Sequence, residues 1–146
     1  MGSLLQRKAL FPEERVRQKL LREMINEKGY CSSHILVERG LNQLPHLAMR
    51  ASLPDRRFDL LAYENKSLNP LLLVECKACK LSERVLEQVL GYNHFVGAPF
   101  FALSNSKQVI TFWQEKGELK YLQKLPSYDE LITLKNSISK KTHFSC

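Results

Sequence analysis

The chain has 146 residues, the size of one ordinary domain with a single continuous core. Its hydrophobic fraction of 44% and charged fraction of 25% are typical of a soluble globular protein, and no apolar run approaches the roughly 20 residues that a membrane helix needs. Lys and Arg total 22 against 15 Asp and Glu, and the formal net charge of +7 suits a polyanionic partner.

The N-terminal part of the chain predicts a helix and no leader. Residues 1–8 contain no apolar stretch long enough for a secretory signal, so we expect a cytoplasmic protein. Pro12 followed by Glu13 and Glu14 is typical of a first helical turn, where proline is tolerated and acids are favoured by the helix dipole. Apolar residues then recur at helical spacing until Gly29, which ends the predicted helix.

Three strands are predicted in the middle of the chain. They cover residues 33–38, 58–63 and 71–77, and the last of these is so apolar that we expect it to be buried on both faces of a sheet. A polar turn at 64–70 joins the second strand to the third, while residues 40–54 have no clear pattern.

The C-terminal half predicts a helix, three strands and a last helix. Ser82 is a suitable N-cap for a helix that runs to about Val96. Strands at residues 100–104, 109–113 and 119–122 follow, and residues 126–131 open the last helix. The order of elements predicts one α/β domain, 1–146, around a mixed central β-sheet flanked by helices. Its core covers about residues 12–125, and residues 126–146 form a C-terminal helix or tail.

The four cysteines are Cys31, Cys76, Cys79 and Cys146. Cys76 and Cys79 have the CxxC spacing of a zinc half-site or a redox pair, but a tetrahedral zinc site needs four ligands and no second close Cys/His pair exists. We therefore expect reduced cysteines that act as small hydrophobic residues. Metal analysis of the purified protein would settle the zinc or redox alternative.

Two ionisable residues, Glu75 and Lys77, interrupt the most apolar strand. Because a strand alternates its faces with a period of two, these two side chains project from one face and Cys76 from the other. Asp59 is likewise set among apolar residues in the preceding strand, so a hairpin of the two strands brings Asp59 towards Glu75.

Two carboxylates held close together repel each other unless a proton or a cation lies between them. Oxygen ligands from Asp and Glu suit Mg²⁺, which also accepts phosphate oxygens, and a neighbouring Lys77 would orient a water or stabilise developing charge. The alternative is a structural ion pair of Glu75 and Lys77 at a strand end, and the position of Asp59 favours the functional interpretation.

The sequence resembles a known family in four places. Phe58-Asp59 and Val74-Glu75-Cys76-Lys77 resemble the split signature of PD-(D/E)xK nucleases. The stretch from Pro12 to Gln18, which includes Glu14 and Arg17, resembles the first-helix motif of the N-terminal nuclease domain of type I restriction enzyme R subunits. Gln88 and Tyr92 match the QxxxY motif that follows the lysine in those subunits. The likeness extends from about Pro12 to Trp113.

The resemblance implies a restriction-endonuclease-like core and a metal-dependent nuclease site. It assigns metal binding to Asp59, Glu75, the backbone carbonyl of Cys76 and Glu14, and makes Lys77 the catalytic lysine. Mg²⁺ is the expected metal, with Mn²⁺ as a substitute.

The resemblance gives a supporting or DNA-contacting role to Gln88, Tyr92 and Arg17. Two of the assigned residues have simpler explanations. Glu14 is equally explained as an acid favoured by the helix dipole. Tyr92 falls on the apolar stripe of its helix, so it is equally explained as a core residue.

The expected function is therefore hydrolysis of phosphodiester bonds in DNA. The alternative is a non-catalytic nucleic-acid-binding module on the same fold. The proline of the family signature is absent before Asp59, and there is no glycine-rich Walker loop, so a helicase motor is not expected in this stretch. We expect a stand-alone relative or a fragment of a larger system. Whether it pairs as a homodimer or with a separate specificity or motor subunit stays open.

Overall fold

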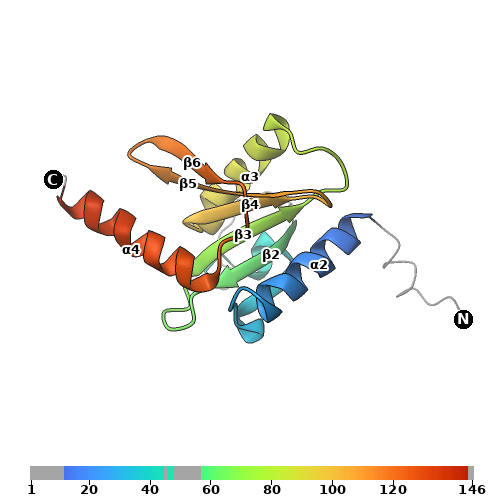
Figure 1. Cartoon of the computed structure of the whole chain (residues 1–146), viewed down its shortest axis with the longest axis horizontal. Coiled ribbons are helices and arrows are strands. Elements are labelled where there is room, and N and C mark those ends of the chain that lie inside the picture. Colours follow the sequence, from blue (N-terminus) through green and yellow to red (C-terminus); the bar gives the residue numbers. More distant parts are fainter. Residues whose placement is uncertain (1–11, 45, 48–56, 145–146) are drawn as a thin grey trace, which may run out of the picture.

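The computed structural model describes residues 12–44, 46–47 and 57–144, which form a sheet covered by helices on both faces (Figure 1). The strands are β1 (Ile35–Gly40), β2 (Arg57–Tyr63), β3 (Pro70–Cys76), β4 (Phe100–Ser104), β5 (Val109–Glu115) and β6 (Glu118–Leu122). The helices are α2 (Pro12–Asn26), α3 (Glu83–Val96) and α4 (Tyr128–Phe144), with short 3₁₀ turns at Ser32–His34 and Leu41–Gln43. The predicted α/β class and order of elements are confirmed.

The six strands lie side by side in chain order, from β1 to β6. All neighbouring pairs are antiparallel except β3 and β4, which are parallel. A parallel pair needs a crossover, and α3 supplies it. This helix begins after Ser82, whose hydroxyl accepts a hydrogen bond from the N–H of Val85, and ends at Gly97 with a φ of 77°. The mixed sheet predicted from the sequence is therefore confirmed, with one parallel pair at its centre.

The sheet has a separate apolar core on each face. Helices α2 and α4 cover one face and α3 covers the other, as Figure 1 shows. The first core contains Val16, Leu20 and Met24 of α2 and Leu131 of α4. The second contains Val89, Tyr92 and Val96 of α3 and Leu41. Strand β3 contributes to both cores, because its residues 71–74 are fully buried. This confirms the prediction that the strand is buried on both faces.

Several predicted boundaries differ from the structure by a few residues, two of them near the site. The first strand begins at Ile35, because Ser32–His34 forms a 3₁₀ turn closed by a hydrogen bond from the His34 N–H to the Cys31 carbonyl. Strand β3 ends at Cys76, so Lys77 lies just beyond it, although its N–H still bonds the Ser104 carbonyl at 2.8 Å. Part of the unpatterned stretch at 40–54 lies outside the described residues.

The free cysteines differ in environment. Cys76 is buried in the core and Cys79 is exposed, and both thiols are free. The buried Cys76 acts as the expected small hydrophobic residue, whereas the exposed Cys79 does not.

Strand β6 forms one edge of the sheet. All five of its residues are exposed, including Leu119, Tyr121 and Leu122, and it pairs only with β5.

Within the described part of the chain, no helix has both the length and the apolar character needed to cross a membrane.

Candidate functional site

The hairpin of β2 and β3 brings two carboxylates together at the end of the sheet. Leu60 pairs with Val74 in the antiparallel ladder, so Asp59 and Glu75 are the next residues along it. The N–H of Cys76 donates a hydrogen bond of 2.7 Å to Oδ2 of Asp59. The side chains of Asp59 and Glu75 are only 20% and 14% exposed. The approach of the two residues predicted from the sequence is therefore present in the structure.

The environment of the pair disfavours two negative charges. Burial raises the pKa of Glu75 to about 7, and the neighbouring Asp59 adds to this shift. Burial also raises the pKa of Asp59, against the opposing effect of the Cys76 N–H. Burial and mutual repulsion therefore favour a proton on the pair over two full negative charges. A cation bound between the carboxylates would replace that proton.

Two further side chains contact Glu75. The ammonium of Lys77 lies 3.5 Å from Oε1 of Glu75, and the lysine side chain is 25% exposed. The hydroxyl of Tyr92, on α3, donates a hydrogen bond to Oε2 of the same carboxylate. Tyr92 also belongs to the apolar core under α3, so the core and site interpretations of this residue both apply.

Arg17 of α2 lies among three carboxylates. Its guanidinium forms ion pairs with Glu14 on the same helix, with Glu38 of β1 at 3.4 Å and with Asp59 at 3.8 Å. Arg17 is only 7% exposed, and an arginine is rarely buried to this extent unless its charge is paired. The structure therefore places Arg17 inside the protein, where it joins α2 to the sheet beside Asp59.

Glu14 is engaged on both of its oxygens. One oxygen pairs with Arg17, and the other accepts a hydrogen bond of 3.1 Å from the amide of Gln18. The sequence interpretation missed Gln18 and Glu38. The spacing of Glu14 to Gln18 was visible as an i, i+4 pair, but the contact of Glu38 depends on how α2 packs on the sheet.

The two other residues assigned by the resemblance lie next to this group. Gln88 is half-buried on α3, one helical turn before Tyr92. The Cys76 thiol projects into the core on the α2 side, where burial raises its pKa, while its N–H contacts Asp59. The roles of Gln88 and of the Cys76 carbonyl stay predictions.

The donor set at the site fits a hard cation. The described residues contain no group of three or more His, Cys, Asp or Glu side chains placed to hold one metal ion. The pair of Asp59 and Glu75 is therefore too small for a structural zinc site. Mg²⁺ is usually bound through one or two carboxylates, with water and substrate phosphates as its other ligands. The two carboxylates suit that mode of binding, with a phosphate completing the site.

Comparison with known proteins places this fold in a family. The family model described as "Type I restriction enzyme R protein N terminus" matches residues 12–126, which include every residue of the site. No curated protein sequence matches the chain.

A solved structure shows the same fold. It is described as a fragment of an HsdR subunit of a type I restriction enzyme from Vibrio vulnificus YJ016. It superposes with a TM-score of 0.58 at 19% identity, over 80% of this chain and 24% of that one. This chain therefore spans about a quarter of that structure, whose fold agrees with the expected restriction-endonuclease-like core. With the family model covering most of its length, the chain belongs to the family of type I restriction enzyme R protein N-terminal domains.

Proposed function

We propose that this chain is a Mg²⁺-dependent nuclease that hydrolyses phosphodiester bonds in DNA. One observation carries the proposal: Asp59 and Glu75 lie half-buried together, with Lys77 beside Glu75, at an end of the sheet. Like charges in such a place are costly without a cation. Membership of the R-protein family and the net charge of +7 support DNA as the polyanion.

The protein orients each carboxylate through one of its oxygens. Oδ2 of Asp59 is held by the Cys76 N–H, and Oε2 of Glu75 is held by the Tyr92 hydroxyl. The second oxygens are Oδ1 of Asp59, which lies near Arg17, and Oε1 of Glu75, which lies near Lys77. Fixed carboxylates of this kind need little reorganisation when a cation and a phosphate arrive.

Mg²⁺, or Mn²⁺ in its place, would polarise the scissile phosphate and lower the pKa of an attacking water when bound at this pair. Asp59 and Glu75 would hold the ion. Lys77, 3.5 Å from Glu75, would orient the water or stabilise the negative charge that develops on the phosphate. Arg17 compensates Asp59 and Glu14 and positions α2 against the site.

A cleavage assay tests the proposal. Duplex, branched, nicked and single-stranded DNA are incubated with Mg²⁺, Mn²⁺ or EDTA, and with the variants Asp59→Asn and Glu27→Gln. Asp59→Asn keeps an acceptor for the Cys76 N–H but removes the charge, so cleavage falls by at least about 10²-fold. Glu27 is exposed beyond α2, and its substitution leaves cleavage unchanged. Wild-type activity in Asp59→Asn, on a substrate that the parent cuts, would refute the site.

A second candidate is a nucleic-acid-binding module that does not cleave. It is favoured by the ion pair of Arg17 with Asp59, which partly compensates that carboxylate without any metal. Such a module would bind every DNA in Ca²⁺ but cut none of them in Mg²⁺ or Mn²⁺. This chain spans only a quarter of the HsdR fragment. We therefore also propose that it works with a separate motor or specificity subunit.

A further inference from the structure

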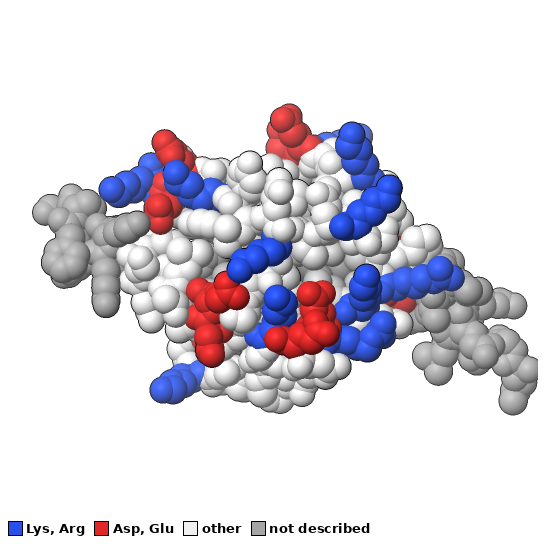
Figure 2. Space-filling model, viewed as in Figure 1, with Lys and Arg blue, Asp and Glu red and all other residues white. Residues whose placement is uncertain are grey.

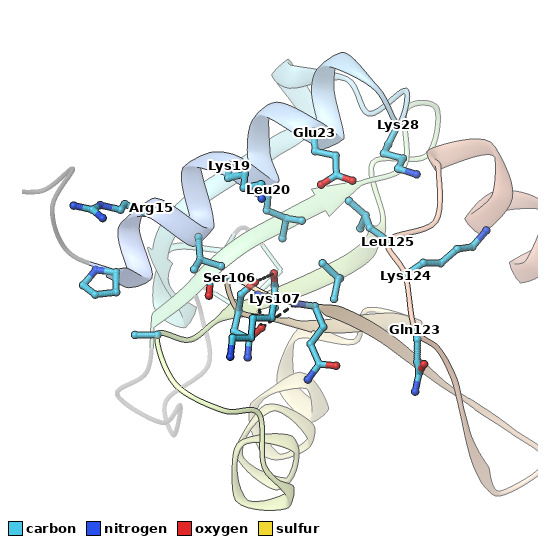
Figure 3. Close-up of a pocket in the computed structure, with 17 residues that line it drawn as sticks. Arg15, Lys19, Leu20, Glu23, Lys28, Ser106, Lys107, Gln123, Lys124 and Leu125 are labelled. Atoms are coloured by element: carbon cyan, nitrogen blue, oxygen red, sulfur yellow. Dashed lines mark hydrogen bonds between the residues drawn. The ribbon is translucent and has the colours of Figure 1, made fainter.

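A groove of about 660 Å³ lies on the opposite flank of α2 from Arg17. It runs between α2 and the turn that joins β4 to β5, and the segment 123–125 closes it on the third side (Figure 3). Val16, Leu20, Val109 and Leu125 give it an apolar floor. The proposed reaction does not use this groove.

The lining of the groove is strongly basic. Its charged residues are Arg15, Lys19, Lys28, Lys107 and Lys124, against the single acid Glu23. Lys124 is already paired with Glu130 at 2.7 Å. Lys19, Lys28 and Lys107 make no ion pair with any residue that the structure describes. The groove therefore carries a surplus of positive charge that its own carboxylate does not neutralise.

The surrounding surface agrees with this charge. Figure 2 shows several Lys and Arg side chains close together towards the end of the molecule where α2 begins, while others lie beside acidic side chains over the middle and the opposite end. An anion would therefore be attracted first to the part of the surface near the start of α2.

The groove adjoins the backbone of the proposed active site. Ala78, in its lining, follows directly after Lys77. Ser104 also lines it, pairs with Cys76 across the parallel ladder and accepts the hydrogen bond from the Lys77 N–H. The groove, on the α2 side of the sheet, and the carboxylates, beside α3, therefore come nearest to each other at the ends of β3 and β4.

Hydrogen bonds fix the backbone of the turn between β4 and β5, which carries Lys107. The side-chain oxygen of Asn105 accepts hydrogen bonds of 2.9 Å and 3.0 Å from the N–H groups of Lys107 and Gln108 (Figure 3). This ordered turn places Lys107 and Ser106 opposite the α2 wall. Donors on two facing walls suit a row of phosphates between them.

The lining also indicates which part of a nucleic acid would bind. None of the described lining residues is aromatic, so the groove offers no surface on which bases would stack. Lysines and small polar side chains instead recognise phosphate and sugar without reading sequence. The stretch of α2 from Arg15 to Glu23 is about 12 Å long, which is roughly the rise of three to four nucleotides of one strand along the axis of a duplex.

We propose that this groove is a sequence-independent binding site for the phosphate backbone of one DNA strand that flanks the scissile bond. The proposal rests on the proposed nuclease function for the identity of the polyanion. The groove contributes to affinity, whereas the carboxylate pair carries out the chemistry.

The test compares two double variants of the full chain with equal net charge. Lys19→Ala/Lys107→Ala removes one unpaired cation from each wall of the groove. Lys66→Ala/Lys116→Ala removes two exposed lysines from turns that do not line it. Binding of a fluorescent DNA duplex is measured in Ca²⁺, which permits binding without turnover, from 0.05 to 0.2 M salt. Thermal melting checks that both variants fold.

We expect the groove variant to lose about 1.8 from the slope of log K against log salt, because each phosphate contact contributes about 0.9. Over this fourfold salt range, the wild-type affinity then falls roughly tenfold more than that of the groove variant. The control keeps the wild-type slope. Equal slopes for the wild type and the folded groove variant would overturn the groove, as would an equal loss in the control.

This outcome is independent of the proposed chemistry. If the wild type binds DNA through the groove but cuts nothing in Mg²⁺ or Mn²⁺, the nuclease fails and the groove stands. If the wild type cuts DNA and the groove variant binds and cuts as well as the control, the groove fails and the nuclease stands.

Discussion

The main-chain N–H of Cys76 donates a hydrogen bond to Oδ2 of Asp59, so the strand that carries Glu75 also orients the carboxylate opposite to it. The distance between the two carboxylates is consequently set by the backbone of one hairpin. Side chains from both helical layers, Arg17 from α2 and Tyr92 from α3, then adjust the charge of this pair. Each of these contacts leads to a separate expectation.

The stability of the metal-free protein should fall as the pH rises from about 5 to 7. The pKa of Glu75 is about 7 in the folded protein, above its ordinary value of 4.5, so the folded state holds a proton that the unfolded state releases. The stability that this proton contributes is fully present below pH 4.5, the ordinary pKa. It is lost as the pH rises through the pKa of the folded protein, and the loss is on the order of 3 kcal/mol. Thermal melting between pH 5 and 8.5 measures this.

Glu75→Gln is the matched control for that titration, because it keeps the shape of the side chain and removes its proton equilibrium. The variant should show a flatter pH dependence than the wild type. Mg²⁺ should stabilise the wild type more at pH 8 than at pH 5.5, since the ion competes with the proton on the pair. Identical pH profiles for Glu75→Gln and the wild type would contradict the raised pKa.

Lys77→Ala should reduce cleavage by at least about 10²-fold while the two carboxylates still bind Mg²⁺. Removal of the nearby positive charge should leave metal affinity unchanged or tighter. Lys80→Ala, at an exposed position three residues later, is the control and should behave as the wild type. Calorimetric titration with Mg²⁺, melting and cleavage are measured on both variants. A large loss of stability without loss of metal-dependent activity would mean that Lys77 is only a structural partner of Glu75.

Tyr92→Phe should shift the pH dependence of cleavage upwards. The tyrosine hydroxyl bonds to Glu75 and lowers its pKa, so its removal makes the carboxyl hold its proton to a higher pH. The acid limb of the pH–rate profile should therefore move to higher pH. Tyr121→Phe, at a residue that is 58% exposed, tests for general effects of losing a hydroxyl. An unshifted profile in Tyr92→Phe would remove Tyr92 from the site and leave it as a core residue.

Arg17→Ala should destabilise the protein by roughly 3 kcal/mol, because it leaves Glu14 and Asp59 without their buried cation. For a chain of this size that corresponds to a fall of about 10 °C in melting temperature. Arg22→Ala, at an exposed position on the same helix, should cost little. If Arg17 only contacts DNA, its loss would weaken binding without lowering the melting temperature.

Much of the fold follows from local pattern. The apolar runs and turn residues predicted the six strands of the sheet and the three helices that cover it. The alternation of side chains in residues 74–77 correctly placed the Glu75 carboxylate on one face of β3 and the buried Cys76 thiol on the other. The errors lie at element ends, as at Ile35, where a 3₁₀ turn formed by polar residues replaced the first two residues of the predicted strand. The ends of helices and strands depend on which backbone N–H and C=O groups form hydrogen bonds. The local sequence pattern does not determine this.

The contacts of the site were harder to foresee than its carboxylates. Asp59 and Glu75 were predictable because they belong to consecutive strands of one hairpin. The partners of Arg17 come from α2, β1 and β2, so its burial depends on how a helix packs across two strands. The bond from Tyr92 to Glu75 likewise depends on the crossover of α3.

The position of β3 within the sheet has a consequence for amide hydrogen exchange. The strand has neighbours on both sides and its residues 71–74 are fully buried, so its amide protons should exchange only when the whole protein unfolds. The exposed edge strand β6 should exchange much faster, through local opening. Glu75 therefore lies on the slowest-exchanging part of the chain. A substitution far from the site that lowers global stability should loosen the carboxylate geometry only when the entire domain opens.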